Sequence, residues 1–201
     1  MIAVVTLFIG VTTAVTSAGP NKNNSDVRYR TYFGKCPSRV AGTLTMKLVK
    51  EFEKSKSLKE VKEKIVKEKL TKEHFISEYD IDYNPYKKFL KFRFDCPEPL
   101  MKVQIYKGNG LESYEAILVG NGQLYDPTYE VLLRTEKKLT NELPYLAIPV
   151  GKMDEDFQNE IANLVSQMKP SFRGYLSELI LGENDELTII LSVDGHPSSV
   201  F

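Results

Sequence analysis

Residues suited to acid–base or metal chemistry are scarce, since the chain has only two histidines, His74 and His196. Neither stands at the spacing from cysteine or carboxylate residues that a metal site requires. Ser198 and Ser199 follow His196 and place hydroxyls near an imidazole, but no acid that would orient the histidine is evident. We therefore expect no metal site, and we interpret this segment as a strand that carries small polar residues.

Carboxylates form two clusters along the chain. Glu183, Asp185 and Glu186 crowd one turn, and paired carboxylates can act as general acid and base. The acidic run at residues 154–156 stands at the start of an expected helix, where the helix dipole accounts for it. The sequence has no Gly-rich phosphate loop before a helix and no G-x-S-x-G motif. We predict a non-enzymatic protein without a cofactor; the alternative is a secreted hydrolase that uses the first cluster or the histidine–serine pair.

The two cysteines, Cys36 and Cys96, lack the C-x-x-C spacing of a zinc or redox site. In an oxidising compartment they could form one bridge across a loop of about sixty residues. The chain-entropy model values such a bridge at about 4 kcal/mol. Two independent, half-buried thiols are the other interpretation, and the sequence leaves both open.

The overall composition is that of a folded protein rather than a disordered one. Hydrophobic residues make up 42% of the chain and aromatic residues 10%, with no Trp. The 27 basic residues balance 27 acidic ones, and the pI is near 6.8. This balance gives no electrostatic reason to expect nucleic acid as a partner.

The N-terminal segment, residues 2–18, is uncharged and apolar, and its small residues before Gly19 resemble a signal cleavage site. The segment is slightly short for a spanning helix, which needs about 20 residues. No Lys or Arg precedes it, which favours either a cleaved signal or a true start upstream of the first residue. We expect residues 1–18 to be an export signal or membrane anchor, residues 19–27 to be a linker, and the body to lie outside the cytoplasm. A buried core strand is the alternative for this segment.

The order strand, helix, helix, strand, strand is predicted for the first folded part of the chain. The strands are expected at residues 28–34, 76–83 and 89–94, because aromatic or apolar residues alternate there with polar ones. Helical spacing predicts a helix over 43–52, and a Ser-x-x-Glu capping box opens a second helix at 58–70. Two prolines after Cys96 then break the pattern and predict a domain boundary.

The rest of the chain, residues 98–201, is predicted to form a mainly antiparallel β-domain with one or two packed helices. The whole chain therefore belongs to the α+β class, with a small β-α-α-β-β domain at residues 28–97 in front. Asp194-Gly195 is a strong hairpin signal, so the last residues are expected to form an edge strand. The strands are expected at 101–106, 114–119, 123–125, 176–181 and 187–193, an apolar extended segment at 143–151, and the helices at 128–139 and 154–168. Helical spacing in the last of these helices places one set of apolar residues on a single side: Phe157, Ile161, Leu164, Val165 and Met168.

Several segments resemble the extracytoplasmic part of the bacterial cell-division family FtsQ/DivIB. YDIDYNPYKKFLKFRFDCPEPLMKVQIY is similar to the end of that family's POTRA domain. EAILVGNGQLYDP, NELPYL and SELILGENDELTIILSVDG resemble successive parts of its β-domain. The resemblance covers about residues 28–201; it depends on the pattern of strands and turns, and the helix at 128–139 is an insertion relative to the family.

This resemblance implies a single-pass inner-membrane scaffold with no catalytic role, whose body lies in the periplasm or an equivalent space. In that family the C-terminal sheet edge recruits FtsB and FtsL, and the POTRA domain aids localisation to the septum. The family continues further, so additional C-terminal residues are expected to complete the domain. The alternatives are a POTRA-type chaperone or assembly module of another envelope system, and a secreted or periplasmic protein after signal cleavage. The residues expected to bind the partner are His196, Ser198, Ser199, Val200 and Phe201.

Overall fold

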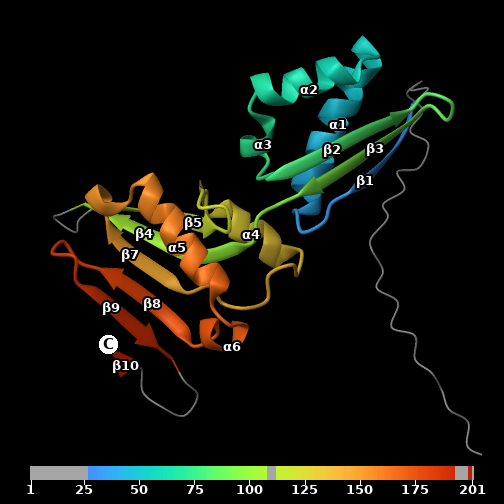
Figure 1. Ribbon diagram of the computed structural model, residues 1–201. Coiled ribbons are helices and arrows are strands. Elements are labelled where there is room, and N and C mark those ends of the chain that lie inside the picture. The colour runs from blue at the N-terminus through green and yellow to red at the C-terminus, as the bar shows by residue number, and fades with distance from the viewer. Residues whose placement is uncertain (1–26, 108–111, 193–198, 201) are drawn as a thin grey trace, which may run out of the picture.

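The computed structural model describes residues 27–107, 112–192 and 199–200, and it shows an α+β chain built on two sheets (Figure 1). The predicted signal or anchor and nearly all of the predicted linker lie outside these residues. Within the described ranges, no helix has both the length and the apolar character needed to cross a membrane.

The first sheet has three strands in the order β1-β3-β2 and is covered on one face by helices, which confirms the predicted β-α-α-β-β fold. β1 runs parallel to β3, and β2 is antiparallel to β3. The elements are β1 (Arg28–Tyr32), α1 (Ser38–Ser55), α2 (Leu58–Lys67), α3 (Leu70–Glu73), β2 (Glu78–Asn84) and β3 (Phe89–Asp95).

The helices of this unit form where the sequence pattern predicts apolar faces. Leu44, Leu48 and Phe52 recur every fourth residue on α1 and are buried against the sheet. The predicted cap of α2 is also present, because the Ser57 Oγ accepts a hydrogen bond from the Glu60 N–H at 3.4 Å. α1 starts five residues before the predicted helix, at Ser38, for a reason that lies elsewhere in the chain and is described below.

The second sheet has seven strands in the order β10-β9-β8-β7-β4-β5-β6. Four of its six pairings are antiparallel; β7 runs parallel to both β4 and β8, and α5 supplies the crossover between β7 and β8 that parallel neighbours need. The strands are β4 (Pro99–Tyr106), β5 (Ser113–Val119), β6 (Leu124–Tyr125), β7 (Tyr145–Pro149), β8 (Leu176–Leu181), β9 (Leu187–Leu191) and β10 (Ser199–Val200). The helices are α4 (Thr128–Thr135), the 3-10 turn η1 (Val150–Lys152), α5 (Glu155–Gln167) and α6 (Pro170–Arg173).

Two helices of this unit differ in detail from the sequence pattern. α4 ends at Thr135 rather than at residue 139, because Lys137 adopts a left-handed conformation (φ 56°) that terminates the helix. On α5 the core face is made by Ile161, Ala162 and Val165, whereas Leu164, which we placed on that face, is 55% exposed. The acidic run lies at the start of α5 as expected, and Asp154 also caps the helix by accepting a hydrogen bond from the N–H three residues later.

The apolar residues form two clusters, and the first continues across the predicted domain boundary. One cluster lies between α5 and the seven-stranded sheet. The other fills the first unit and extends to Tyr125, Tyr129 and Leu143 of the second. Phe75, which follows α3, makes the contact, with its ring centroid 4.9 Å from that of Tyr129 and 5.2 Å from that of Tyr125. The two sheets therefore share buried surface.

Candidate partner-binding site

The candidate site is the free edge of the seven-stranded sheet, where β9 and β10 lie (red in Figure 1). Ser199 and Val200 form β10, which pairs with Leu191 and Ile190 of β9. Three of the five predicted partner-binding residues lie outside the described residues: His196, Ser198 and Phe201.

The outer edge of β9 is only partly covered by β10. The Ser192 N–H donates to the Tyr175 carbonyl at 2.8 Å, which directs the main-chain groups of residue 192 toward β8. Because these groups alternate along a strand, those of Leu187, Ile189 and Leu191 point the other way, toward the edge. Only Leu191 among them is matched to a residue of β10, and no described strand pairs with the outer side of the other two.

Four of the five side chains of β9 are apolar, yet none of the five residues is buried. Leu187 is 54% exposed, and Ile189 and Leu191 pack only partly on the core beneath α5. By contrast, Leu146 and Ile148 of the central strand β7 are completely buried. The edge therefore combines unmatched main-chain groups with half-exposed apolar side chains, which is the chemistry that an added strand covers.

The acidic turn between β8 and β9 lies in solvent. Glu183, Asp185 and Glu186 are all exposed, and Asp185 is paired with Lys152. The Gly182 N–H donates to the Glu186 carbonyl at 2.8 Å, which closes the hairpin. The carboxylates thus occupy a hairpin turn, and in the described part of the chain no cluster of His, Cys, Asp or Glu is arranged to hold a metal.

The other polar residues singled out in the sequence have local partners. The His74 ring is buried, and its Nδ1 lies 3.0 Å from the Leu70 carbonyl oxygen, which holds the ring against α3. Within the acidic run at 154–156, Asp154 caps α5 and Glu155 and Asp156 occupy its first turn. These residues therefore lie at the ends of α3 and α5, where backbone groups or the helix dipole account for their positions.

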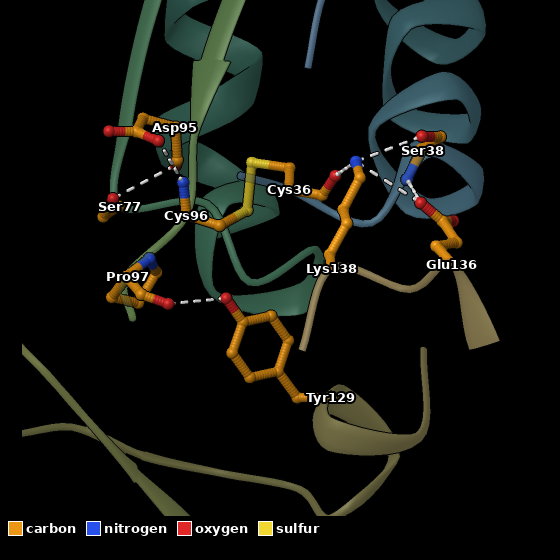
Figure 2. The surroundings of a disulfide bond; sticks show 9 residues. All are labelled: Cys36, Ser38, Ser77, Asp95, Cys96, Pro97, Tyr129, Glu136 and Lys138. Carbon is orange, nitrogen blue, oxygen red and sulfur yellow. Dashed lines mark hydrogen bonds and ion pairs between the residues drawn. A yellow bond between two sulfur atoms is a disulfide. The ribbon is translucent and has the colours of Figure 1, made fainter. Parts of the chain in front are cut away.

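A second region rich in specific contacts lies where the two sheets meet, around a disulfide between Cys36 and Cys96 (Figure 2). The bridge joins the loop before α1 to the segment between β3 and β4, and both cysteines are buried. Asp95 supports this segment through its side-chain oxygen, which accepts from the Cys96 N–H at 3.1 Å. The disulfide therefore fixes the start of α1 next to the passage from one sheet to the other.

The α4 arm, which we define as residues 128–143, contacts this disulfide region from the second unit. The Glu136 carboxylate accepts hydrogen bonds from the Ser38 N–H (2.7 Å) and the Arg39 N–H (3.2 Å). Glu136 thereby caps α1, although 98 residues separate it from Ser38, and this explains the early start of the helix. Burial alone would raise the pKa of Glu136. The hydrogen bonds from the two backbone N–H groups outweigh this effect, so the pKa of Glu136 lies below the usual value.

Lys138 and Tyr129 complete the contact of the arm with the disulfide region. The Lys138 ammonium donates to the Cys36 carbonyl and to the Ser38 Oγ (3.2 Å). The Tyr129 hydroxyl donates to the Pro97 carbonyl at 2.6 Å (Figure 2). Its ring is fully buried, and this burial raises the pKa of Tyr129 above the usual value. Three polar side chains of one arm thus satisfy backbone groups on both sides of the disulfide.

The sequence did not reveal these three residues of the α4 arm, because Glu136, Lys138 and Tyr129 follow no motif. Their partners are 98, 102 and 32 residues away, respectively. The one available signal was the unexpected position of the helix at 128–139 within the β-domain pattern.

No protein-family model matches the chain, and no curated protein matches it. Among solved structures, the chain is similar to the major extracytoplasmic domain of the trans isomer of the bacterial cell-division protein DivIB from Geobacillus stearothermophilus. The identity is 16%, the TM-score is 0.30, and the match covers 53% of this chain and 79% of that one. The likeness is distant, and no functional conclusion is drawn from it.

Proposed function

We propose that this protein is a non-enzymatic envelope scaffold of the FtsQ/DivIB type, which recruits partners of the bacterial division machinery by strand addition at the β9–β10 edge. The observation that carries the proposal is the outer side of β9, where Leu187 and Ile189 have outward main-chain groups without a described strand. Partners of the FtsB and FtsL type are the expected occupants, in line with the sequence resemblance.

The physical basis is the behaviour of open sheet edges. Such an edge aggregates, is covered by its own chain, or accepts a strand from another chain. An added strand gains main-chain hydrogen bonds, and its side chains cover those of β9. Four of these β9 side chains are Ile or Leu: Leu187 is exposed and the other three are partly exposed. Removing apolar surface from water is worth about 25 cal/mol per Å². The edge can therefore bind a strand both through main-chain hydrogen bonds and through burial of apolar side chains.

An envelope location agrees with the disulfide and with the N-terminal sequence. Disulfides persist in oxidising compartments and are rare in the reducing cytosol of most organisms. The Cys36–Cys96 bridge is buried and closes a long loop, as a structural disulfide does. The apolar sequence of residues 2–18 supports the same location, since we propose it as the export or anchoring segment.

The test is to deplete the protein in its native cell while a fluorescent fusion reports its position. Filamentous cells with mid-cell bands of the fusion are expected. Rescue is then attempted with Ile189→Pro, which removes one outward N–H without removing a bond to β8. Thr188→Pro, whose N–H points toward β8, is the matched control for damage to the fold.

The expected result is that Ile189→Pro folds, keeps its disulfide and fails to restore division. A photo-crosslinker placed at position 187 should capture a partner when residue 189 is Ile and should capture none when it is Pro. Normal division after depletion, with a diffuse envelope signal, would overturn the proposal. An export defect in place of filaments would favour the POTRA-type assembly module.

A further inference from the structure

The first sheet carries a charge pattern that the role of the β9–β10 edge does not use. One face of this sheet packs on α1 and α2, and the other face is open to solvent. On the open face, β1 carries Arg28 and Arg30, and its neighbour β3 carries Lys91 and Arg93. Four cations thus occupy two adjacent strands.

The charges on the two sides of the central strand β3 are opposite. On one side, β2 places Asp80 opposite Arg93 and Asp82 opposite Lys91, so each cation has a carboxylate across the strand pair. On the other side, Arg30 of β1 stands opposite Lys91. Opposite charges in cross-strand pairs are stabilising and like charges are destabilising. The β1 side of the sheet therefore lacks the acidic neighbour that the β2 side has.

The cations of β1 and β3 converge on Tyr32, which is 40% exposed at the end of β1. The Arg30 guanidinium donates to the Tyr32 hydroxyl at 3.4 Å, and the Lys91 Nζ lies 5.5 Å from the centre of its ring. The hydrogen bond from Arg30, together with the positive charges of Arg30, Lys91 and Arg93, lowers the pKa of Tyr32 below the usual value. The cations therefore create a positive local potential around Tyr32, on the β1 side of the sheet.

β1 also has a free main-chain edge. It is the outermost strand of the sheet, and no described strand pairs with its other side. The Arg28 N–H donates to the Lys88 carbonyl at 2.9 Å, toward β3, so alternation directs the main-chain groups of Tyr29 and Thr31 outward. A groove of about 850 Å³ reaches from β1 across β3 to β2. Arg30, Tyr32 and Arg93 line its β1 side, and Glu78, Asp80 and Asp95 line its β2 side.

We propose that the outer edge of β1 binds an extended segment of a partner protein that carries carboxylates at alternate positions. In such a strand the side chains on one face lie beside Arg28 and Arg30, and the main chain pairs with Tyr29 and Thr31. β2 is the template within this molecule, because Glu78, Asp80 and Asp82 already present this pattern to the opposite side of β3. Charge complementarity selects the occupant, and strand pairing sets its register.

The probe is a capped peptide with the β2 sequence EYDIDYN, titrated into the full chain in detergent and followed by amide NMR. The largest shifts are expected at the Tyr29 and Thr31 amides. A neutral peptide, NYNINYN, should bind more weakly, and an N-methylated acidic peptide, which keeps the charges but cannot pair, should lose these shifts. Binding should weaken as salt concentration rises.

The matched variants are Arg28→Glu with Arg30→Glu, and the control Lys62→Glu with Lys67→Glu on the exposed side of α2. The first pair of substitutions should weaken binding of the acidic peptide about tenfold, because two attractive cross-strand pairs become repulsive. It should also improve binding of a basic peptide, KYKIKYN, whereas the control pair should leave both affinities unchanged.

Equal and weak binding of all peptides would overturn the proposal and leave the arginines as charges that protect an edge from aggregation. Sedimentation identifies the occupant. A chain that stays monomeric at concentrations where the peptide binds supports a partner segment. Self-association that is lost in Asp80→Lys with Asp82→Lys would instead identify β2 of a second copy and overturn the proposed partner.

Discussion

The disulfide region and the β9 edge treat backbone polar groups in opposite ways. At the disulfide region, the N–H groups of Ser38 and Arg39 and the carbonyls of Cys36 and Pro97 all receive partners from the α4 arm. Along β9, the outward groups of residues 187 and 189 have no partner strand among the described elements. A buried polar group without a hydrogen bond is costly, whereas an exposed one can exchange water for a partner at little cost. The contacts of the disulfide region are therefore expected to persist in the folded protein, whereas the edge of β9 is expected to pair with an added strand.

Apolar side chains show the same contrast. Tyr129 at the disulfide region is fully buried between two other aromatic rings, whereas Leu187 at the edge is 54% exposed. Substitutions at the disulfide region should therefore change folding stability, and those at the edge should change binding. Four predictions test this separation, beginning with the largest expected change in stability.

Removing the disulfide should have the largest effect. Cys36→Ser with Cys96→Ser is expected to lower the free energy of unfolding by about 4 kcal/mol, because the open chain regains the entropy of a closed 60-residue loop. Denaturant unfolding of the oxidised protein, the reduced protein and the double variant measures this loss. An unchanged midpoint in the double variant would show that the disulfide region does not depend on the bridge.

Removing one hydroxyl from the disulfide region should have an intermediate effect. Tyr129→Phe keeps the ring and deletes the bond to the Pro97 carbonyl, so about 1 kcal/mol should be lost, since a part-buried carbonyl is left without its donor. The matched control is Tyr86→Phe, because Tyr86 is 97% exposed. Equal unfolding midpoints for the two variants would contradict the role given to Tyr129.

The capping carboxylate should produce a smaller effect that depends on pH. Glu136→Gln is expected to lower stability by about 1 kcal/mol at neutral pH, as loss of an N-terminal cap does. The folded-state pKa of Glu136 lies below its unfolded value of about 4.3. Its contribution is therefore complete above that pH and is lost as the pH falls through the folded-state pKa.

Urea unfolding of the two proteins between pH 7 and pH 3 measures this dependence. The difference between unmodified protein and Glu136→Gln should shrink as the pH falls. A difference that stays constant over this range would show that the charge of Glu136 does not support α1.

Leu187→Lys should have the smallest effect on stability and a large effect on partner binding. The side chain is 54% exposed at a sheet edge, so the free energy of unfolding should change by no more than about 0.5 kcal/mol. Co-purification of cross-linked partners from the native cell should nevertheless fall sharply, because a charge replaces part of the surface that an added strand covers. If the variant captures as much partner as the unmodified protein, the partner does not bind at the β9 edge.

Local patterns in the sequence predicted most elements, because their signals lie within a few residues. The N-cap at Ser57, the acidic start of α5 and the alternation of β2 and β3 all appear in the structure. The prediction failed for Leu164, where helical spacing could not distinguish the core face from its margin. The start of α1 was also wrong, because Glu136, its cap, comes from a distant part of the chain.

The candidate sites were less predictable than the fold for the same reason. Partner positions at the C-terminal end were expected from the hairpin signal and the family resemblance. All five remain predictions, and three of them lie outside the described residues. The contrast between the two sides of β3 needs the strand order, which a sequence does not contain: β1 and β3 are neighbours although about sixty residues separate them.

The short passage from β3 to β4 also has a mechanical consequence. It comprises three residues, the first of which is Cys96, bonded to the loop before α1, and the Tyr129 hydroxyl holds the Pro97 carbonyl from the opposite side. The passage therefore cannot act as a free swivel. Force applied by a partner at β9 would pass along the sheet to β4 and reach the first unit through this held passage rather than through a free hinge.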